Sequence, residues 1–187
     1  MNNTFILLRH AQTLIDLSIP TEKWKISEQG EKKIKKLVET GIFDDVELLF
    51  SSDEEKAVKT IEHLSKRIGK KPIISSSFRE IYRGKENIQT QEKYERVIEK
   101  ILVDNNFRYK DWESTETAIN RFKKGILSID ERNQNRKILI VSHGLILTIY
   151  FANILKCPSR IIFERWKKTE FCGWGIVKDE KVIKDIV

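Results

Sequence analysis

Two histidines of this 187-residue chain directly follow apolar runs. One run ends on Arg9 and His10, and a second, residues 138–141, leads through a serine into His143 and Gly144. An imidazole can act as a general acid or base, a nucleophile or a metal ligand. A guanidinium presents a planar fork of donors that suits phosphate or carboxylate. These residue types at the ends of apolar strands predict a site for an anion.

Three chemistries fit a pair of histidines. A metal site needs a third ligand, and the sequence has no H-x-H, H-E-x-x-H or cysteine cluster, so no metal is predicted. General acid–base catalysis by the two imidazoles stays open. A nucleophilic histidine that attacks phosphorus best explains the neighbouring arginine, because cations must stabilise the transferring phosphoryl group. The alternative without chemistry is an Arg-His pair that caps a strand edge, and the two matching strand ends count against it.

Hydrophobic patterning predicts the elements that carry these residues. Strands are expected at 4–8, at 46–51, in a short stretch from Pro72 and at 137–142, with a C-terminal hairpin turning near Asp179-Glu180. Helices are expected at about 28–40, 53–69, 91–103, 115–130 and 145–155, the last almost wholly apolar and therefore buried. This order predicts a three-layer α/β/α sandwich, with a mainly parallel central sheet and an antiparallel edge.

The predicted sheet brings the two histidines together. In open α/β sheets, ligands bind outside the carboxyl ends of the strands. If both strands are parallel and central, His10 and His143 converge on one crevice. Gly144 starts the turn into the apolar helix, whose N-terminus offers free N–H groups and the positive end of a dipole. Together with Arg9, these groups form the predicted anion site.

Length and composition indicate the number of domains, the kind of partner and the cellular environment of the protein. The length favours one domain over residues 1–187, and no apolar run is long enough to span a membrane. The net charge of +7 favours anionic partners, but many lysines alternate with glutamate on solvated helix faces, so nucleic acid is not expected. The N-terminus does not look like a signal peptide. Cys157 and Cys172 are expected to be free thiols in a reducing cytoplasm, with a bridge as the alternative in an exported protein.

A set of ordered motifs resembles the histidine phosphatase superfamily, which has the phosphoglycerate mutase-like fold. LLRHAQT resembles its R-H-G-E-T signature, and VSHG near the second histidine resembles its V-S-H-G. Between them, and in the order of the family, lie ISEQG (26–30), SSDEEKAVKT (51–60), FREIYRG (78–84), and Glu113-Ser114 with Arg121. The likeness covers roughly residues 4–155. Each motif alone is weak, and the ordered set is specific.

The resemblance implies a role for each matching residue. His10 is implied as the nucleophile that accepts the phosphoryl group, and Arg9 and His143 as the groups that bind its oxygens. Glu80 is implied as the acid that protonates the leaving oxygen and the base that then activates water. Lys56 and Gly144 complete the implied phosphate site. The family needs no metal or cofactor, and it is largely cytoplasmic in bacteria.

The chain departs from the family pattern in three ways. Lys56 stands where a second pocket arginine is usual, and a lysine cannot grip two oxygens in a planar fork. Asp16 stands where asparagine is common, and its carboxylate would repel phosphate. Asp53-Glu54 replaces Pro-Leu and is expected to place two acids in the first turn of a helix. These acids would make the rim of the pocket less positive.

Four further residues have both a structural and a functional interpretation. Glu80 lies in a charged loop and would be an ordinary surface acid without the resemblance. Arg83 could contact the distal part of a substrate, but a solvated arginine is the preferred interpretation. His63, on the flank of a helix, is interpreted as a surface histidine. Trp24 could form a wall of the pocket or pack in the core.

The sequence therefore predicts a metal-independent phosphomonoesterase that acts through a phosphohistidine on His10. A non-catalytic phospho-ligand binding or regulatory protein on the same fold is the alternative, and Lys56 and Asp16 motivate it. A phosphoglycerate mutase, an α-ribazole phosphatase and a phosphohistidine-protein phosphatase are lesser alternatives. The expected partner is a phosphorylated small molecule or phosphoprotein, and the expected state is a monomer or homodimer. A cap-like insertion at about 78–112 is expected to select the substrate.

Overall fold

A mixed β-sheet forms the centre of the protein. The computed structural model describes residues 2–16, 19–84, 88, 90–104 and 107–187. Within them lie the strands β1 (Thr4–Arg9), β2 (Leu48–Ser51), β3 (Ile73–Ile74), β4 (Lys137–Ser142), β5 (Trp174–Lys178) and β6 (Lys181–Lys184). The sheet order is β3-β2-β4-β1-β5-β6. The strands β1, β2, β3 and β4 are parallel to one another. β5 pairs antiparallel with β1, and β6 pairs antiparallel with β5.

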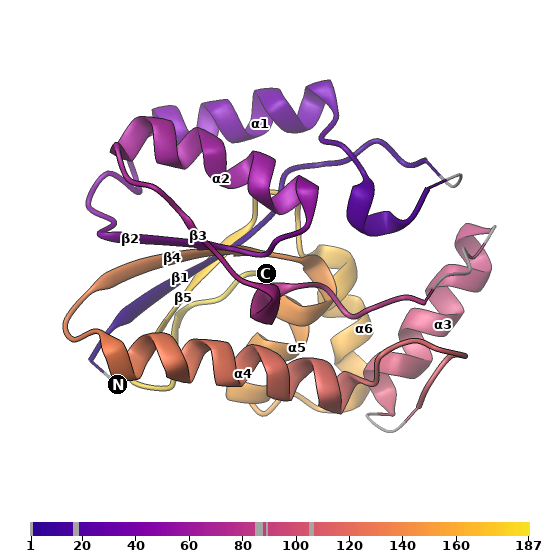
Figure 1. Cartoon of the computed structure of the whole chain (residues 1–187). Helices are drawn as coiled ribbons and strands as arrows, with labels where there is room; N and C mark the ends of the chain where they lie inside the picture. The colour runs from indigo at the N-terminus through magenta and orange to yellow at the C-terminus, as the bar shows by residue number, and fades with distance from the viewer. Residues whose placement is uncertain (1, 17–18, 85–87, 89, 105–106) are drawn as a thin grey trace.

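Helices cover both faces of this sheet (Figure 1). The helices α1 (Glu28–Glu39) and α2 (Glu55–Ile68) lie on one face, and α4 (Thr115–Arg132), α5 (Gly144–Ile154) and α6 (Ser159–Lys168) on the other. The helix α3 (Gln91–Val103) lies at the end of the molecule and packs against α6. Two 3₁₀ turns, η1 (Thr21–Lys23) and η2 (Ser76–Phe78), lie in loops. The predicted three-layer α/β sandwich with a mainly parallel sheet and an antiparallel edge is confirmed.

Alternating side chains of the central strands divide the core into two layers. In β1, Phe5 and Leu7 point into the layer shared with α4 and α5, whereas Ile6 and Leu8 point into the layer shared with α1 and α2. This alternation is the period of a strand that is buried on both faces. The helix α5 is buried on nearly all sides, as its apolar sequence predicts.

Pairing of β1 with β4 sets the geometry of the predicted site. The two strands are parallel and in register, so that Arg9 lies opposite Ser142. The next residues are His10 and His143, which therefore leave the sheet at the same edge. The convergence that the sequence predicts follows directly from this register.

Several predicted boundaries differ from the observed ones. β2 starts at Leu48 instead of residue 46, and β3 contains only two residues because the chain turns into η2. The sequence analysis missed α6, whose ten residues are mostly polar or exposed and follow Pro158. The hairpin turn at Asp179 and Glu180 is confirmed, and both residues have positive φ.

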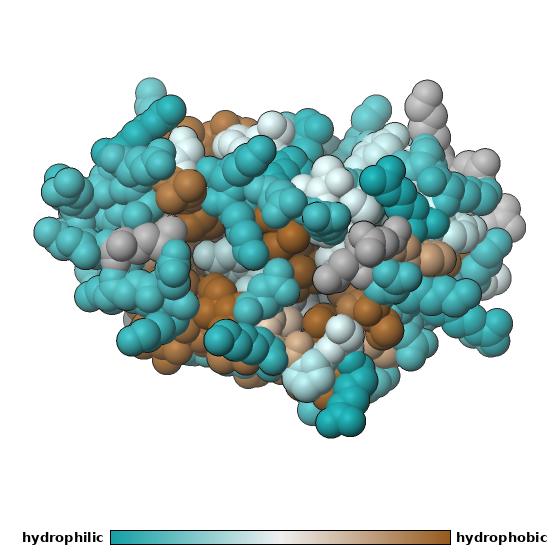
Figure 2. Space-filling view, turned by 90° about the horizontal axis from the view of Figure 1, so that it is seen from below, coloured by the Kyte–Doolittle hydropathy of each residue, from teal (hydrophilic) through white to brown (hydrophobic). Residues whose placement is uncertain are grey.

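Some sequence predictions concern the chain as a whole. Cys157 and Cys172 are both free. The single domain over 1–187 and the cap at about 78–112 stay predictions, and residues 85–87, 89, 105 and 106 of that cap lie outside the described residues. No described helix is both long and apolar enough to cross a membrane. On the face shown in Figure 2, hydrophobic residues form small groups between hydrophilic side chains.

We predict that Gly125→Ala destabilises the protein although alanine is the better helix former. Gly125 lies in α4, where an added Cβ would come 2.7 Å from the Cβ of Ser77 and 3.0 Å from Phe78. Overpacking of this kind typically costs about 1–3 kcal/mol, which exceeds the gain of ~1 kcal/mol in helix propensity. Urea unfolding measures the change.

The matched control is Lys124→Ala on the exposed face of the same helix, which should stay within about 0.5 kcal/mol of the wild type. A Gly125→Ala variant more stable than the wild type would show that the loop before Glu80 is not pressed against α4.

Candidate active site

The two histidines meet at the carboxyl ends of β1 and β4. The ring centroids of His10 and His143 lie 5.1 Å apart, and both side chains are buried. The loop after β1 is held in place by α2, because the backbone N–H of Ala11 donates to the Thr60 hydroxyl at 2.9 Å. The imidazoles are thus fixed by the sheet and by the neighbouring helix.

His10 is oriented by its own backbone. Its Nδ1 lies 2.8 Å from the carbonyl oxygen of Ala11, and a carbonyl can only accept, so this nitrogen carries the proton. Burial holds the pKa of His10 well below its usual value, with further lowering by His143, Lys56 and Arg9. A neutral imidazole with its proton on Nδ1 leaves a lone pair on Nε2, which is what a nucleophile requires.

His143 is the N-cap residue of α5 and is also held neutral. Its Nε2 lies 2.8 Å from the hydroxyl of Ser52 and 3.4 Å from a carboxylate oxygen of Glu54. Burial holds its pKa well below the usual value, and the cations Lys56, Arg83 and Arg9 lower it further. Its Nδ1 is buried and has no hydrogen-bond partner among the described residues.

The side chain of Arg9, the last residue of β1, is held by the segment before β5. Its guanidinium lies 3.9 Å from the ring centroid of Phe171, and its Nη1 donates to the carbonyl of Thr169. Burial lowers its pKa to about 10, so the group stays charged at neutral pH. A Cβ on Gly144 would lie 3.0 Å from the guanidinium carbon, so a glycine at this position makes room for Arg9. The sequence analysis missed Phe171 and Thr169, which lie in the part of the tail without a recognisable motif.

The N-terminus of α5 is occupied by Glu80. One carboxylate oxygen of Glu80 accepts the N–H of Leu145 at 2.9 Å, and the other accepts the N–H groups of Ile146 and Ile81 at 3.0 Å each. The sequence analysis expected these amides to be free for a ligand. A side-chain carboxylate satisfies them instead, which places Glu80 within the site.

Arg121 holds the loop that carries Glu80. Its guanidinium donates to the carbonyls of Ser76, Ser77, Arg79 and Glu80 at 2.9–3.2 Å and is itself held by the carboxylate of Glu113 at 2.8 Å. Five donors in a rigid fork allow one arginine to fix several turns of backbone. Glu113 and Arg121, which the motif resemblance includes, therefore hold the loop of Glu80 in position.

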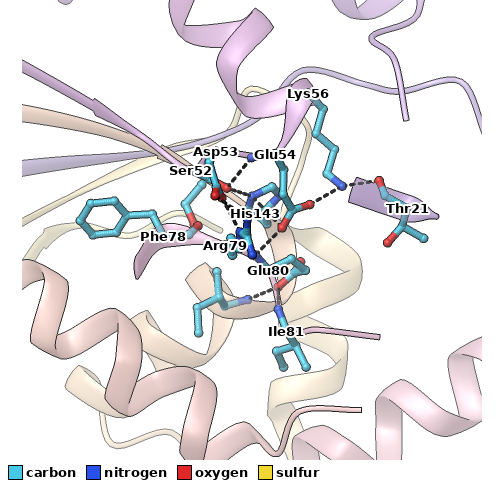
Figure 3. A network of polar contacts seen from close by, with 12 residues as sticks. Thr21, Ser52, Asp53, Glu54, Lys56, Phe78, Arg79, Glu80, Ile81 and His143 are labelled. Carbon is cyan, nitrogen blue, oxygen red and sulfur yellow. Dashed lines mark hydrogen bonds and ion pairs between the residues drawn. The ribbon is translucent and has the colours of Figure 1, made fainter. Parts of the chain in front are cut away.

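A buried ion pair lies where the sequence predicted acids at the rim of the pocket (Figure 3). Glu54 precedes α2 as its N-cap residue, and its carboxylate lies 2.7 Å from Nζ of Lys56 and accepts the N–H of Glu80 at 2.8 Å. Both side chains are less than 10% exposed. The prediction that Asp53 and Glu54 lie in the first turn of the helix is therefore wrong, since the helix begins at Glu55.

The pair weakens the charge that Lys56 can offer. Nζ of Lys56 also donates to the carbonyl of Thr21 at 2.7 Å. Burial lowers the pKa of Lys56, and Glu54 opposes this shift. Burial raises the pKa of Glu54, but Lys56, the backbone N–H of Glu80 and Arg83 together outweigh it, so this pKa is lowered. Lys56 thus reaches the site as predicted, with its charge largely compensated by Glu54.

Arg83 is partly buried beside the site, whereas a solvated arginine was the preferred prediction. Its side chain is 18% exposed, and its guanidinium lies 3.7 Å from the carboxylate of Glu80 and 5.3 Å from the ring centroid of Tyr94. Its Nε is buried without a partner among the described residues. The sequence offered no signal for this burial, because α3 supplies the aromatic ring over which Arg83 lies.

Other predicted residues lie nearby or away from the site. Trp24 lines the cavity next to the histidines, as one interpretation proposed. His63 pairs with Glu31 at 3.0 Å between α2 and α1. Asp16 is exposed, and its carbonyl accepts the indole N–H of Trp24.

A cavity of about 410 Å³ lies beside the two histidines. Its wall includes Arg9, His10, Lys56, Glu80, Arg83 and Gly144. Three buried nitrogen atoms without a described partner belong to the site, namely Nε of Arg9, Nε of Arg83 and Nδ1 of His143. Buried polar groups are normally hydrogen-bonded, so the two free guanidinium N–H donors, on Arg9 and Arg83, suit an anion with several oxygen atoms. Within the described residues, no group of three or more His, Cys, Asp or Glu side chains could hold a metal ion.

Comparison with known families identifies the class of protein. A model of the histidine phosphatase superfamily (branch 1) matches residues 5–181. The chain therefore belongs to the histidine phosphatase superfamily. A search of curated proteins found no match.

Solved structures with the same fold include proteins described as phosphatases. Mycobacterial glucosyl-3-phosphoglycerate phosphatase is 19% identical with a TM-score of 0.74, over 92% of this chain and 88% of the other. YhfR of Bacillus stearothermophilus is 18% identical with a TM-score of 0.75, over 97% and 95% of the two chains. A mutant phosphoserine phosphatase of Entamoeba histolytica, in complex with phosphoserine, is 16% identical with a TM-score of 0.73, over 97% and 94%. These similarities show the fold.

We predict that the two buried histidines make the protein less stable in acid. Their pKa values are lowered in the folded state, so below about pH 6.5 the unfolded chain binds protons that the folded site excludes. Their contribution to stability is complete above that pH. It is lost as the pH falls below it, by roughly 1 kcal/mol per pH unit for each histidine.

Urea unfolding at pH 7.5, 6.5 and 5.5 measures this slope. His143→Gln should show a shallower loss than the wild type, because one of the two proton-excluding groups is gone. A loss that is equally steep in both proteins would contradict the prediction.

Proposed function

We propose that the protein is a metal-independent phosphomonoester hydrolase that acts through a phosphohistidine on His10. The observation that carries the proposal is a neutral, Nδ1-bonded His10 that shares one cavity with the buried Nε atoms of Arg9 and Arg83, neither of which has a partner among the described residues. Membership of the histidine phosphatase superfamily and the phosphatases among the structural neighbours support it.

The chemistry has two steps. Nε2 of His10 attacks phosphorus, the bond from phosphorus to the ester oxygen breaks, and Glu80, which must enter this step in its protonated carboxylic acid form, gives that proton to the leaving oxygen. Glu80 then takes a proton from water, which attacks the phosphohistidine and releases phosphate and the imidazole. The loop held by Arg121 keeps Glu80 in position for both transfers.

The cations that would stabilise the charge on the transferring phosphoryl group differ from the family pattern. Arg9 provides one guanidinium with a free Nε, and Arg83 provides a second. Lys56 occupies the position of the usual arginine but is paired with Glu54. We infer that Arg83 takes over part of the role of that missing arginine.

The second candidate function is a phospho-ligand binding protein without turnover. The Glu54–Lys56 pair favours it, because compensation of a cation beside the phosphoryl group weakens stabilisation of the transition state. Hydrolysis that depends on His10 separates the two functions.

We predict hydrolysis of p-nitrophenyl phosphate in the presence of EDTA, with loss of at least about a thousandfold in kcat/KM for His10→Ala. Rapid mixing and denaturing quench should trap an acid-labile phosphoryl group on wild-type protein and none on His10→Ala. The matched control is His63→Ala, which removes a histidine outside the cavity and should retain wild-type activity. Absence of both turnover and phosphohistidine would refute the hydrolase and favour the binding protein.

We predict that Glu54→Gln strengthens the binding of inorganic phosphate by roughly tenfold, because it frees the charge of Lys56 in a buried site. The same variant should be less stable without phosphate, since it leaves a buried cation unpaired. Lys56→Met should have the opposite effect on affinity, because it leaves the carboxylate of Glu54 beside the anion.

Calorimetric titration with phosphate and urea unfolding measure these effects. Glu55→Gln is the matched control, because Glu55 is the exposed neighbour of Glu54 in the first turn of α2. Equal phosphate affinities for Glu54→Gln and wild type would show that the ion pair does not limit anion binding.

A further inference from the structure

Aromatic side chains form much of the wall of the same cavity. Five rings line it, and we call this part the aromatic chamber: Trp24, Tyr94, Trp112, Trp166 and Phe171. They come from five separate segments, namely the loop after η1, α3, the segment before α4, α6 and the segment before β5. The chamber therefore exists only in the folded protein.

Contacts between these rings fix the walls of the chamber relative to one another. The ring centroid of Tyr94 lies 6.1 Å from that of Trp166 and 6.5 Å from that of Trp112. Trp166 also stacks on Phe163 at 5.8 Å, and Trp112 is almost fully buried. A wall fixed in this way is already formed before a ligand enters, which reduces the entropy lost on binding.

Among the described residues, the charged lining of the cavity consists of Arg9, Lys56, Glu80 and Arg83, which belong to the phosphate site described above. Two of these groups border the aromatic chamber, since Arg9 lies over the ring of Phe171 and Arg83 lies near that of Tyr94. The remaining polar lining consists of the uncharged Gln12, Thr13, Thr21, Thr90 and Gln91. A second anionic group on a ligand would have to compete for Arg83, whose guanidinium already lies beside Glu80. Burial of an unpaired carboxylate among aromatic rings is unfavourable.

We propose that the aromatic chamber binds the leaving group of the substrate, and that the substrates are phosphate monoesters of uncharged alcohols with a flat aromatic or largely apolar body. The inference rests on the proposed phosphate site. Phosphate at Arg9 and His10 would direct the ester oxygen toward Glu80 and the organic group toward the rings. Aromatic surface gains free energy from burial against Trp and Tyr, and the glutamine and threonine side chains can bond hydroxyl groups on its edge.

Non-hydrolysable phosphonates test the chamber without any need for turnover. Calorimetry should show benzylphosphonate binding at least tenfold more tightly than methylphosphonate, since the two share the phosphonate and differ by one ring. 2-Carboxyethylphosphonate should bind no more tightly than methylphosphonate. Equal affinities for benzylphosphonate and methylphosphonate, or tightest binding of the carboxylate, would overturn the inference.

Tryptophan variants locate the effect. Trp24→Leu and Trp166→Leu should each reduce the preference for benzylphosphonate to less than threefold, with little change in affinity for methylphosphonate. The matched control is Trp174→Leu, a half-buried tryptophan on β5 that packs against Phe43 outside the cavity, and it should keep the full preference. A preference that survives in both chamber variants would also overturn the inference.

Turnover measured in parallel separates this inference from the proposed function. Wild-type protein should hydrolyse 1-naphthyl phosphate with at least tenfold higher kcat/KM than glycerol phosphate or phosphoserine. Preference for benzylphosphonate without hydrolysis of any ester would support the chamber and refute the hydrolase. Hydrolysis with no preference for aromatic esters or phosphonates would support the hydrolase and refute the chamber.

Discussion

The parallel pairing of β1 with β4 is the constraint on which the rest of the site depends. Because the register places Arg9 opposite Ser142, both strands end at the same edge of the sheet. The ring centroids of His10 and His143 therefore lie 5.1 Å apart. A shift by one residue would turn each side chain to the other face of the sheet. The apolar residues of both strands, which are buried on two faces, fix this register more strongly than any contact within the site could.

Several charged side chains lie close together at this edge of the sheet and are mostly buried. Each therefore needs a partner of opposite charge or a hydrogen-bonding group. Glu80 is stabilised by backbone N–H groups of α5, and Lys56 by Glu54. Buried ions without such partners would be too costly to retain. Among the described residues, Nε of Arg9 and Nε of Arg83 have no partner, so these lining groups have capacity for a ligand. The site thus combines a rigid, satisfied framework with a few free groups around one cavity.

The segment between Glu80 and Arg121 links the chemistry to the shape of the cavity. Arg121 fixes the loop of Glu80 through four carbonyl groups, while Tyr94 and Trp112, from the same part of the chain, build the aromatic chamber. Contact of Tyr94 with Trp166 ties this segment to α6. Changes in this region can therefore alter the space for a leaving group without moving the two histidines.

The sequence by itself determined the strand ends that carry Arg9, His10 and His143, the parallel sheet and the family, because local apolar periodicity and ordered motifs encode them. Only the tertiary structure decided that Glu80 occupies the N-terminus of α5, that Glu54 compensates Lys56 and that Arg83 lies partly buried beside Glu80. These features depend on how separate segments meet in space, and a charged residue in a loop carries no local sign of its eventual partner. The missed helix α6 has the same cause, since the contact of Trp166 with Tyr94 of α3 is set by the fold.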